Sequence, residues 1–224
     1  MPILGFRPVL RIVFTLVAIA GSLPGGAQAV PTVSFEFSFP GSEPERYEIV
    51  VPLQGEASYA SNGKLTANSD SDDFKAAFRL SETTRGKIFD LAKRADYFQG
   101  ELDSKKKVAS TGAKTLQYKD DQKSTTQTYN YSTIASVQQL TQLFQDLSTT
   151  LEFGRRLDYY HRYQKLALDD ELKRMEDMQR DNSLAEVPAV GSILNEIVTD
   201  STLINPVRAR AQRILAKAGI VPPQ

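Results

Sequence analysis

The densest group of side chains able to grip a charged or aromatic partner lies in one short stretch of the C-terminal half. Arginine forks bind carboxylates and phosphates, and tyrosine supplies large contact area at protein interfaces. The structural alternative is a solvated helix whose tyrosines cover a neighbouring sheet. The predicted partner-binding residues are Arg155, Arg156, Tyr159, Tyr160, His161, Arg162 and Tyr163.

Catalytic and metal chemistry find little support among the residue types. The chain has one histidine, His161, and no cysteine, which excludes thiol catalysis and argues against a zinc site, because zinc prefers nitrogen and sulfur ligands. Asp70, Asp72 and Asp73 are close together but lack the glycine and terminal carboxylate of a calcium loop. We therefore interpret them as a polar turn, and we expect neither a metal nor another cofactor.

Two serines precede a lysine by the spacing found in one class of acyl-transfer enzymes. Ser61 to Lys64 spans an Asn-Gly turn, and Ser104 to Lys107 lies in a charged loop, whereas such enzymes place the motif on a buried helix. We interpret both as chance matches. The 27 basic and 27 acidic side chains of the chain give no indication of nucleic-acid binding.

Residues 1–29 have the three regions of a cleavable signal peptide. Arg7 and Arg11 precede an apolar run, and Ala27-Gln28-Ala29 supplies the small residues of a cleavage site. A retained membrane anchor is the alternative, but the run of about 12 residues falls short of the roughly 20 that span a bilayer. We predict a periplasmic or secreted mature chain that begins near Val30 and has no transmembrane segment.

The first elements that the sequence predicts along the chain are strands. Apolar residues alternate with polar ones in VSFEFSF, RYEIVV and the segment from Phe74 to Leu80, a period of two that indicates half-buried strands. Asn62-Gly63 predicts a hairpin turn that pairs a third and a fourth strand. A further strand pair is expected around Asp120-Asp121.

The pattern then changes to a helical period. Ser81 is a candidate N-cap for a helix over about 82–98, and a second helix begins near Thr133. That helix either continues past Gly154 as a rod of about 48 residues or bends at Gly154, and we favour the continuous helix. Its apolar stripe consists of Val137, Leu140, Phe144, Leu147 and Leu151.

Two short helices end the chain. One follows Pro188, and the other has Asn205 as its predicted cap, Pro206 at its first helical position and Gly219 at its end. They predict a helical hairpin whose apolar side must be covered by the long helix or by another chain.

These elements predict an α+β fold, in which an antiparallel sheet carries two helices on one face and is followed by a long helix and a C-terminal helical hairpin. The predicted organisation is a signal peptide at 1–29, a sheet domain at 30–153 and a helical extension at 154–224.

The segments KIFDLAKRADYF, KTLQYKDDQKSTTQTYNY and SVQQLTQLFQDL follow an order of helix, hairpin and leucine-striped helix that resembles small exported bacterial α+β domains of uncharacterised function. The resemblance covers roughly residues 32–153. Such domains often carry a cysteine near the second strand, which this chain lacks, and the C-terminal helices have no counterpart in them.

Our leading hypothesis is a noncatalytic envelope protein that acts as an interaction or structural module. Its helical extension would contact an envelope protein or a second copy of the chain, with no role for nucleic acid. The alternative is an extracytoplasmic hydrolase whose catalytic groups come from distant segments, which would require a pocket with convergent titratable groups.

Overall fold

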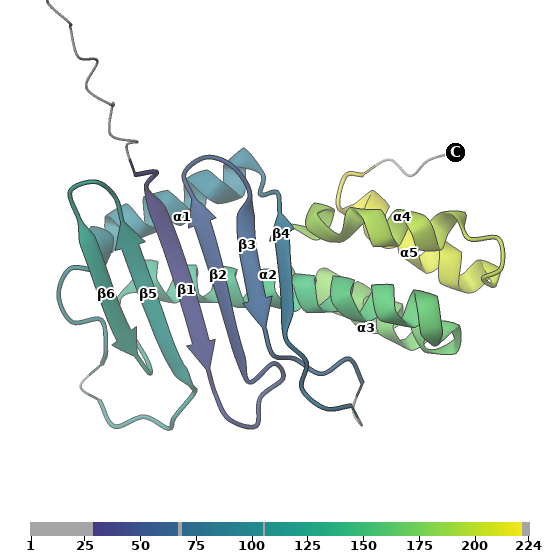
Figure 1. Cartoon of the computed structure of the whole chain (residues 1–224), viewed down its shortest axis with the longest axis horizontal. Helices are drawn as coiled ribbons and strands as arrows, with labels where there is room; N and C mark the ends of the chain where they lie inside the picture. The colour runs from purple at the N-terminus through teal and green to yellow at the C-terminus, as the bar shows by residue number, and fades with distance from the viewer. Residues whose placement is uncertain (1–28, 67–68, 105, 221–224) are drawn as a thin grey trace, which may run out of the picture.

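The computed structural model describes residues 29–66, 69–104 and 106–220, so the predicted signal peptide lies outside the described residues apart from Ala29. One antiparallel sheet has the strand order β4-β3-β2-β1-β5-β6 (Figure 1). The strands are β1 (Thr32–Ser38), β2 (Arg46–Pro52), β3 (Ala57–Ser61), β4 (Phe74–Phe78), β5 (Ala113–Lys119) and β6 (Ser124–Tyr129).

The alternation of side chains in β1 builds the core under the sheet. Val33 and Phe35 are fully buried, and Phe35 pairs in register with Ile49 of β2 and Leu116 of β5. The Phe35 ring stacks on Phe144, with ring centroids 5.1 Å apart. Successive side chains of a strand point to opposite faces, so these buried residues share one face of the sheet. The helices cover that face, as the contact between Phe35 and Phe144 shows.

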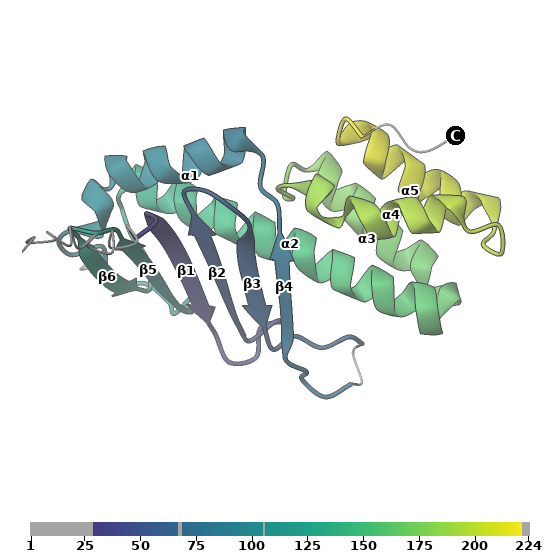
Figure 2. The ribbon, with the colours of Figure 1, turned by 45° about the horizontal axis from the view of Figure 1, so that its top comes forward.

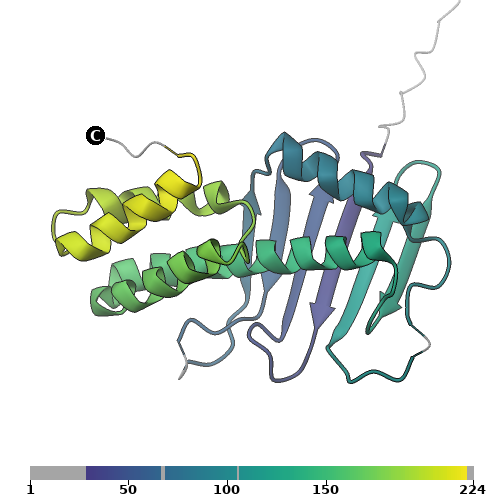
Figure 3. The same cartoon turned by 180° about the vertical axis from the view of Figure 1, so that it is seen from behind.

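Two helices form that covering layer (Figure 3), namely α1 (Glu82–Arg94) and α2 (Ala135–Tyr163). The Ser81 hydroxyl accepts a hydrogen bond from the backbone amide of Thr84, which confirms the predicted N-cap. A short 3-10 turn, η1 (Asp96–Phe98), follows α1 and buries Phe98. The predicted apolar stripe of α2 is buried throughout.

The α2 helix continues through Gly154 and extends beyond the β4 edge of the sheet. A Cβ atom at Gly154 would overlap the side chain of Val190, so glycine allows close packing here and does not bend the helix. The helix ends at Tyr163, where Gln164 leaves helical geometry. The prediction of continuity is therefore confirmed, but a rod of about 48 residues is wrong.

Beyond Gln164 the chain reverses and forms a helical extension beside the β4 edge (Figure 2). The predicted C-terminal hairpin is present, and its apolar side is covered by α2 and α3 of the same chain. Ile204, not Asn205, occupies the cap position of the last helix. The elements are η2 (Lys165–Ala167), α3 (Leu168–Arg180), η3 (Val187–Val190), α4 (Gly191–Thr199) and α5 (Asn205–Lys217).

The α+β prediction is confirmed, but the hairpin at Asn62-Gly63 is wrong. In the described residues between β3 and β4, Lys64 and Ser71 form an isolated bridge, and β3 pairs instead with β4. The Asn62 side chain accepts a hydrogen bond from the backbone amide of Arg46. This contact ends β3 against β2, and the loop then reaches across to α2.

Candidate functional site

The residues predicted to bind a partner occupy the C-terminal turns of α2 and surround the helix on every side. Consecutive residues of an α-helix are separated by about 100°, so an almost unbroken run cannot share one face. The Arg155 and Arg156 side chains are only 4% and 14% exposed, whereas Tyr163 is 71% exposed. The structure thus divides the set into an inner and an outer group.

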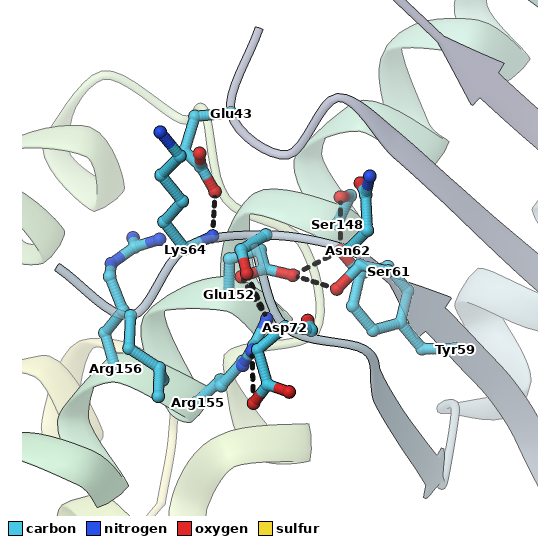
Figure 4. Close-up of polar contacts among 12 residues, drawn as sticks. Glu43, Tyr59, Ser61, Asn62, Lys64, Asp72, Ser148, Glu152, Arg155 and Arg156 are labelled. Atoms are coloured by element: carbon cyan, nitrogen blue, oxygen red, sulfur yellow. Dashed lines mark hydrogen bonds and ion pairs between the residues drawn. The ribbon is translucent and has the colours of Figure 1, made fainter. Parts of the chain in front are cut away.

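The inner group begins with Arg155, which fastens the loop after β3 to α2 (Figure 4). Its guanidinium donates to the carbonyl oxygens of Gly63 and Asp72, at 3.1 and 3.0 Å. It also lies over the Phe74 ring, 5.0 Å from the centroid. These contacts make Arg155 a structural residue that holds the loop.

Next to Arg155, the buried carboxylate of Glu152 accepts hydrogen bonds from hydroxyl groups of the sheet. Oε1 of Glu152 accepts hydrogen bonds from the hydroxyls of Tyr59, at 2.8 Å, and Ser61, at 2.6 Å. The Tyr59 hydroxyl is also 2.9 Å from the Ser148 hydroxyl. Burial, followed by the nearby charge of Glu152, raises the pKa of Tyr59, so this phenol stays protonated and donates.

Arg156 links α2 to α3. Its Nε donates to Glu171 at 2.6 Å, and Arg174 donates to the other oxygen of Glu171 at 3.0 Å. Both guanidinium groups lie near the Phe153 ring, at 5.0 and 6.0 Å from its centroid. Glu171 is almost fully buried, so a single carboxylate faces two arginines at the junction of sheet layer and extension.

Tyr160 and His161 also make contacts within the chain. The Tyr160 hydroxyl donates to the Leu65 carbonyl oxygen at 3.1 Å. His161 Nε2 is 3.0 Å from Asp200, which also accepts a 2.7 Å hydrogen bond from Lys165. Hydrogen bonds from Lys165 and then Thr202 hold the pKa of Asp200 well below its usual range. Asp200 thereby ties the end of α2 to the turn between α4 and α5.

The outer group lies at the end of the extension farthest from the sheet. The Tyr159 and Tyr163 rings pack together with centroids 5.3 Å apart, and Arg162 pairs with Asp158 at 2.8 Å. Leu166 in η2 is 99% exposed and Ile204, at the start of α5, is 66% exposed. We call Tyr163, Leu166 and Ile204 the tip patch.

The structure separates the members of the serine-lysine motif at Ser61. The Ser61 hydroxyl faces Glu152 inside the protein, whereas Lys64 is exposed. Within the described ranges, no group of three or more histidine, cysteine, aspartate or glutamate residues could hold a metal ion. No helix in the described part of the chain is both long and apolar enough to cross a membrane.

Sequence reasoning missed the residues that complete both groups. Glu152 and Glu171 stand in charged helices where nothing in the sequence distinguishes a buried acid from a solvated one. The sequence carries one weak sign that Leu166 is exposed: this apolar residue does not continue the apolar stripe of α2. Ile204 comes near the end of α2 only because the chain reverses direction twice, once after α2 and once after α3.

Comparison with known proteins adds no family. Neither a protein-family model nor a curated protein sequence matches this chain.

Proposed function

We propose that this chain is a noncatalytic, exported envelope protein whose tip patch docks onto a partner protein. The observation that carries the proposal is the exposure of Leu166, Ile204 and Tyr163 on two segments that Lys165 joins through its hydrogen bonds to Asp200 and Thr202. Burying a large apolar side chain stabilises a protein or a complex by roughly 1.5–3 kcal/mol. Contact with a partner would bury these exposed side chains.

The surroundings of the tip patch have the composition of an interface rather than of an ordinary surface. Tyr159 and Tyr163 are aromatic, Arg162 is exposed beside them, and Lys165 holds the turn in place through Asp200 and Thr202. Tyrosine and arginine are enriched among the residues that dominate binding energy. A turn that is already ordered also loses less conformational freedom on binding.

The hydrolase alternative has one observation in its favour: Glu43 and Glu152 both line a cleft between the β1–β2 loop, α2 and α3. Oε1 of Glu152 accepts two hydroxyl donors, and Ser61 is the nearest nucleophile type. The sole histidine of the chain contacts Asp200 near the C-terminal end of α2, so the group beside Ser61 is the Glu152 carboxylate and not a histidine. These contacts support binding more than catalysis.

Photo-crosslinking in the native envelope tests the proposal. In one variant a photoreactive residue replaces Leu166. In the control it replaces Leu53, a 41% exposed leucine between β2 and β3. We expect a discrete protein adduct from position 166 only. Adding Ile204→Asp should remove that adduct, because it places a charge inside the same contact.

Three results would overturn the proposal. The same adducts at positions 53 and 166 would show that the tip patch has no preferred partner. Adducts with lipid alone would identify a membrane contact, and an adduct of twice the chain mass alone would identify self-association. The lipid adduct and the adduct of doubled mass differ from a heteromeric protein adduct in mass, and the first result is recognised by comparing the two positions.

A further inference from the structure

The β4 strand lies at an edge of the sheet and presents backbone groups that no strand of the described residues pairs. The Asn62 amide donates to a carbonyl oxygen of β2 at 3.1 Å. Backbone bonding alternates along an antiparallel strand, so Tyr59 of β3 bonds β4 through its register partner Ala76. The amides and carbonyl groups of Lys75 and Ala77 therefore point outward from the sheet edge.

A groove lies along this edge, with a volume of about 360 Å³, within the range of ligand sites. Ala76 and Ala77 both line it, although neighbouring side chains of a strand point to opposite faces. The groove therefore adjoins the strand edge itself and not one face of the sheet. Residues of α2, η3 and α4, which belong to the helical extension beside β4 (Figure 1), form its other wall.

Part of the helical wall is apolar. Leu151 of α2, Val190 of η3 and Ile193 of α4 line the groove, and all three are nearly buried. Such a surface accommodates the aliphatic stem of a long side chain, while the charged end of that side chain continues toward solvent.

The exposed charge of the groove is negative. Asp158 and Glu196 line it together with Arg162, which pairs with Asp158 at 2.8 Å. The Glu196 side chain is 60% exposed and lies 3.9 Å from His161 Nδ1, beyond hydrogen-bond distance. Arg155 also lines the groove, but its guanidinium is buried and bonds the loop after β3. Two carboxylates against one exposed arginine favour a cationic side chain.

We propose that the β4 edge binds an extended peptide as an additional antiparallel strand, with a lysine or arginine opposite Ala76. Directly opposite side chains of paired strands share a face, so this side chain points between α2 and α4 and its cation faces Glu196. The two neighbouring peptide residues bond the backbone of Lys75 and Ala77. In this mode main-chain hydrogen bonds supply affinity and the side chain supplies specificity. The groove is separate from the tip patch and does not depend on the proposed function.

Calorimetric titration of the purified protein with the blocked pentapeptide acetyl-Thr-Thr-Lys-Thr-Thr-amide tests the proposal. We expect millimolar or tighter binding. Replacing the central lysine by glutamate should weaken binding at least about tenfold, because it brings a third carboxylate into the groove.

Two methylated peptides test the backbone pairing separately from the charge. Methylation of the amide nitrogens of the second and fourth residues removes the donors that face β4 and should abolish binding. Methylation of the lysine amide alone removes a donor that points away from β4. It should change the affinity less than about threefold.

Ala77→Pro removes an outward amide that the sheet does not use, a change that edge strands tolerate. It should weaken binding at least about tenfold while the melting temperature changes little. Thr126→Pro on the opposite edge is the matched control. The Asp120 amide bonds the Lys123 carbonyl oxygen, and the register of β5 and β6 then places the Thr126 amide outward as well.

Glu196→Lys tests the charge and remains informative if Ala77→Pro fails to fold. It should weaken binding of the lysine peptide and strengthen binding of the glutamate peptide, each at least about fivefold. Asp90→Lys on α1 changes the net charge equally at a 53% exposed side chain and should leave both affinities unchanged.

Absence of binding at about 10 mM lysine peptide would overturn the proposal. Equal binding of the lysine and glutamate peptides, or of the two methylated peptides, would also overturn it, as would equal effects of Ala77→Pro and Thr126→Pro. A dimer of the peptide-free protein in sedimentation that Ala77→Pro abolishes would identify a second copy of the chain as the occupant instead.

Discussion

At the scale of single residues, the buried acid Glu152 connects three parts of the molecule. Tyr59 and Ser61 of β3 donate to it, and Arg155 lies beside it while holding the loop that follows β3. Hydrogen bonds to a charged acceptor contribute more to stability than those between neutral groups, roughly 1.5–3 against 0.5–1.5 kcal/mol. The sheet and α2 are therefore joined at this point by strong polar contacts as well as by apolar packing.

Tyr59→Phe tests this contribution without changing the packing volume. We expect the free energy of unfolding to fall by about 1.5–3 kcal/mol, measured by urea denaturation. Tyr129→Phe is the matched control, because the Tyr129 hydroxyl bonds the neutral Thr141 hydroxyl at 2.6 Å in a similarly buried site. Equal losses in the two variants would contradict a special role for the Glu152 charge.

Asp200 predicts a pH dependence of stability. Hydrogen bonds from Lys165 and Thr202 lower its pKa in the folded protein, so its contribution is present above the unfolded-state pKa of about 3.9 and is lost as the pH falls below it. Asp200→Asn should lower stability in urea at neutral pH, and the difference from the native chain should shrink below about pH 4.

The control for that measurement is Asp177→Asn, which removes an exposed pair with Arg180 and should change stability little at either pH. A difference between Asp200→Asn and the native chain that stays constant with pH would show that hydrogen bonding, not charge, carries the effect.

At the scale of elements, α2 packs through Gly154 against η3. The absence of a side chain there allows Val190 to contact the helix backbone, because a Cβ atom would overlap the valine side chain. Glycine inside a helix costs up to about 1 kcal/mol relative to alanine. Close packing between α2 and η3 is the compensating interaction.

Gly154→Ala should therefore destabilise the protein, because overpacking costs about 1–3 kcal/mol and outweighs the gain in helix propensity. Val190→Ala in the same chain should relieve the overlap, so the double variant should be more stable than the sum of the single effects predicts. Urea denaturation of the four chains measures this coupling. A more stable Gly154→Ala variant would show that η3 yields without cost.

At the scale of the whole molecule, α2 belongs to two bodies at once. Its N-terminal half covers the sheet, and its C-terminal half carries α3, α4 and α5. Glu186 adds a second connection, since its carboxylate accepts hydrogen bonds from the backbone and side chain of Ser81 at the start of α1. The predicted boundary at residue 153 falls inside a continuous helix.

We expect one cooperative thermal transition for the full chain, with equal calorimetric and van't Hoff enthalpies. A chain that ends at Phe153 should melt at a lower temperature or fail to fold, because it loses Arg155 and the packing of Phe153, which is 1% exposed in the full chain. Unchanged melting of the shortened chain would instead show that residues 30–153 fold independently.

Local patterns explain how much of the fold could be predicted. The alternation in β1, the cap at Ser81 and the stripe of α2 depend on neighbours within one or two turns of the chain, and each appears in the structure as expected. The hairpin at Asn62-Gly63 failed because the partner of β3 is β4, which follows a loop held by Arg155 from a distant helix.

The sequence by itself determined the strands, the helices and the run of arginines and tyrosines at the end of α2, because periodicity and residue type are local properties. Only the tertiary structure decided that Arg155 and Arg156 face inward, that Lys165 contacts the turn between α4 and α5, and that Glu152 Oε2 has no hydrogen-bond donor. These placements depend on contacts between residues far apart in the chain, and such contacts form only when the helices and the sheet pack together.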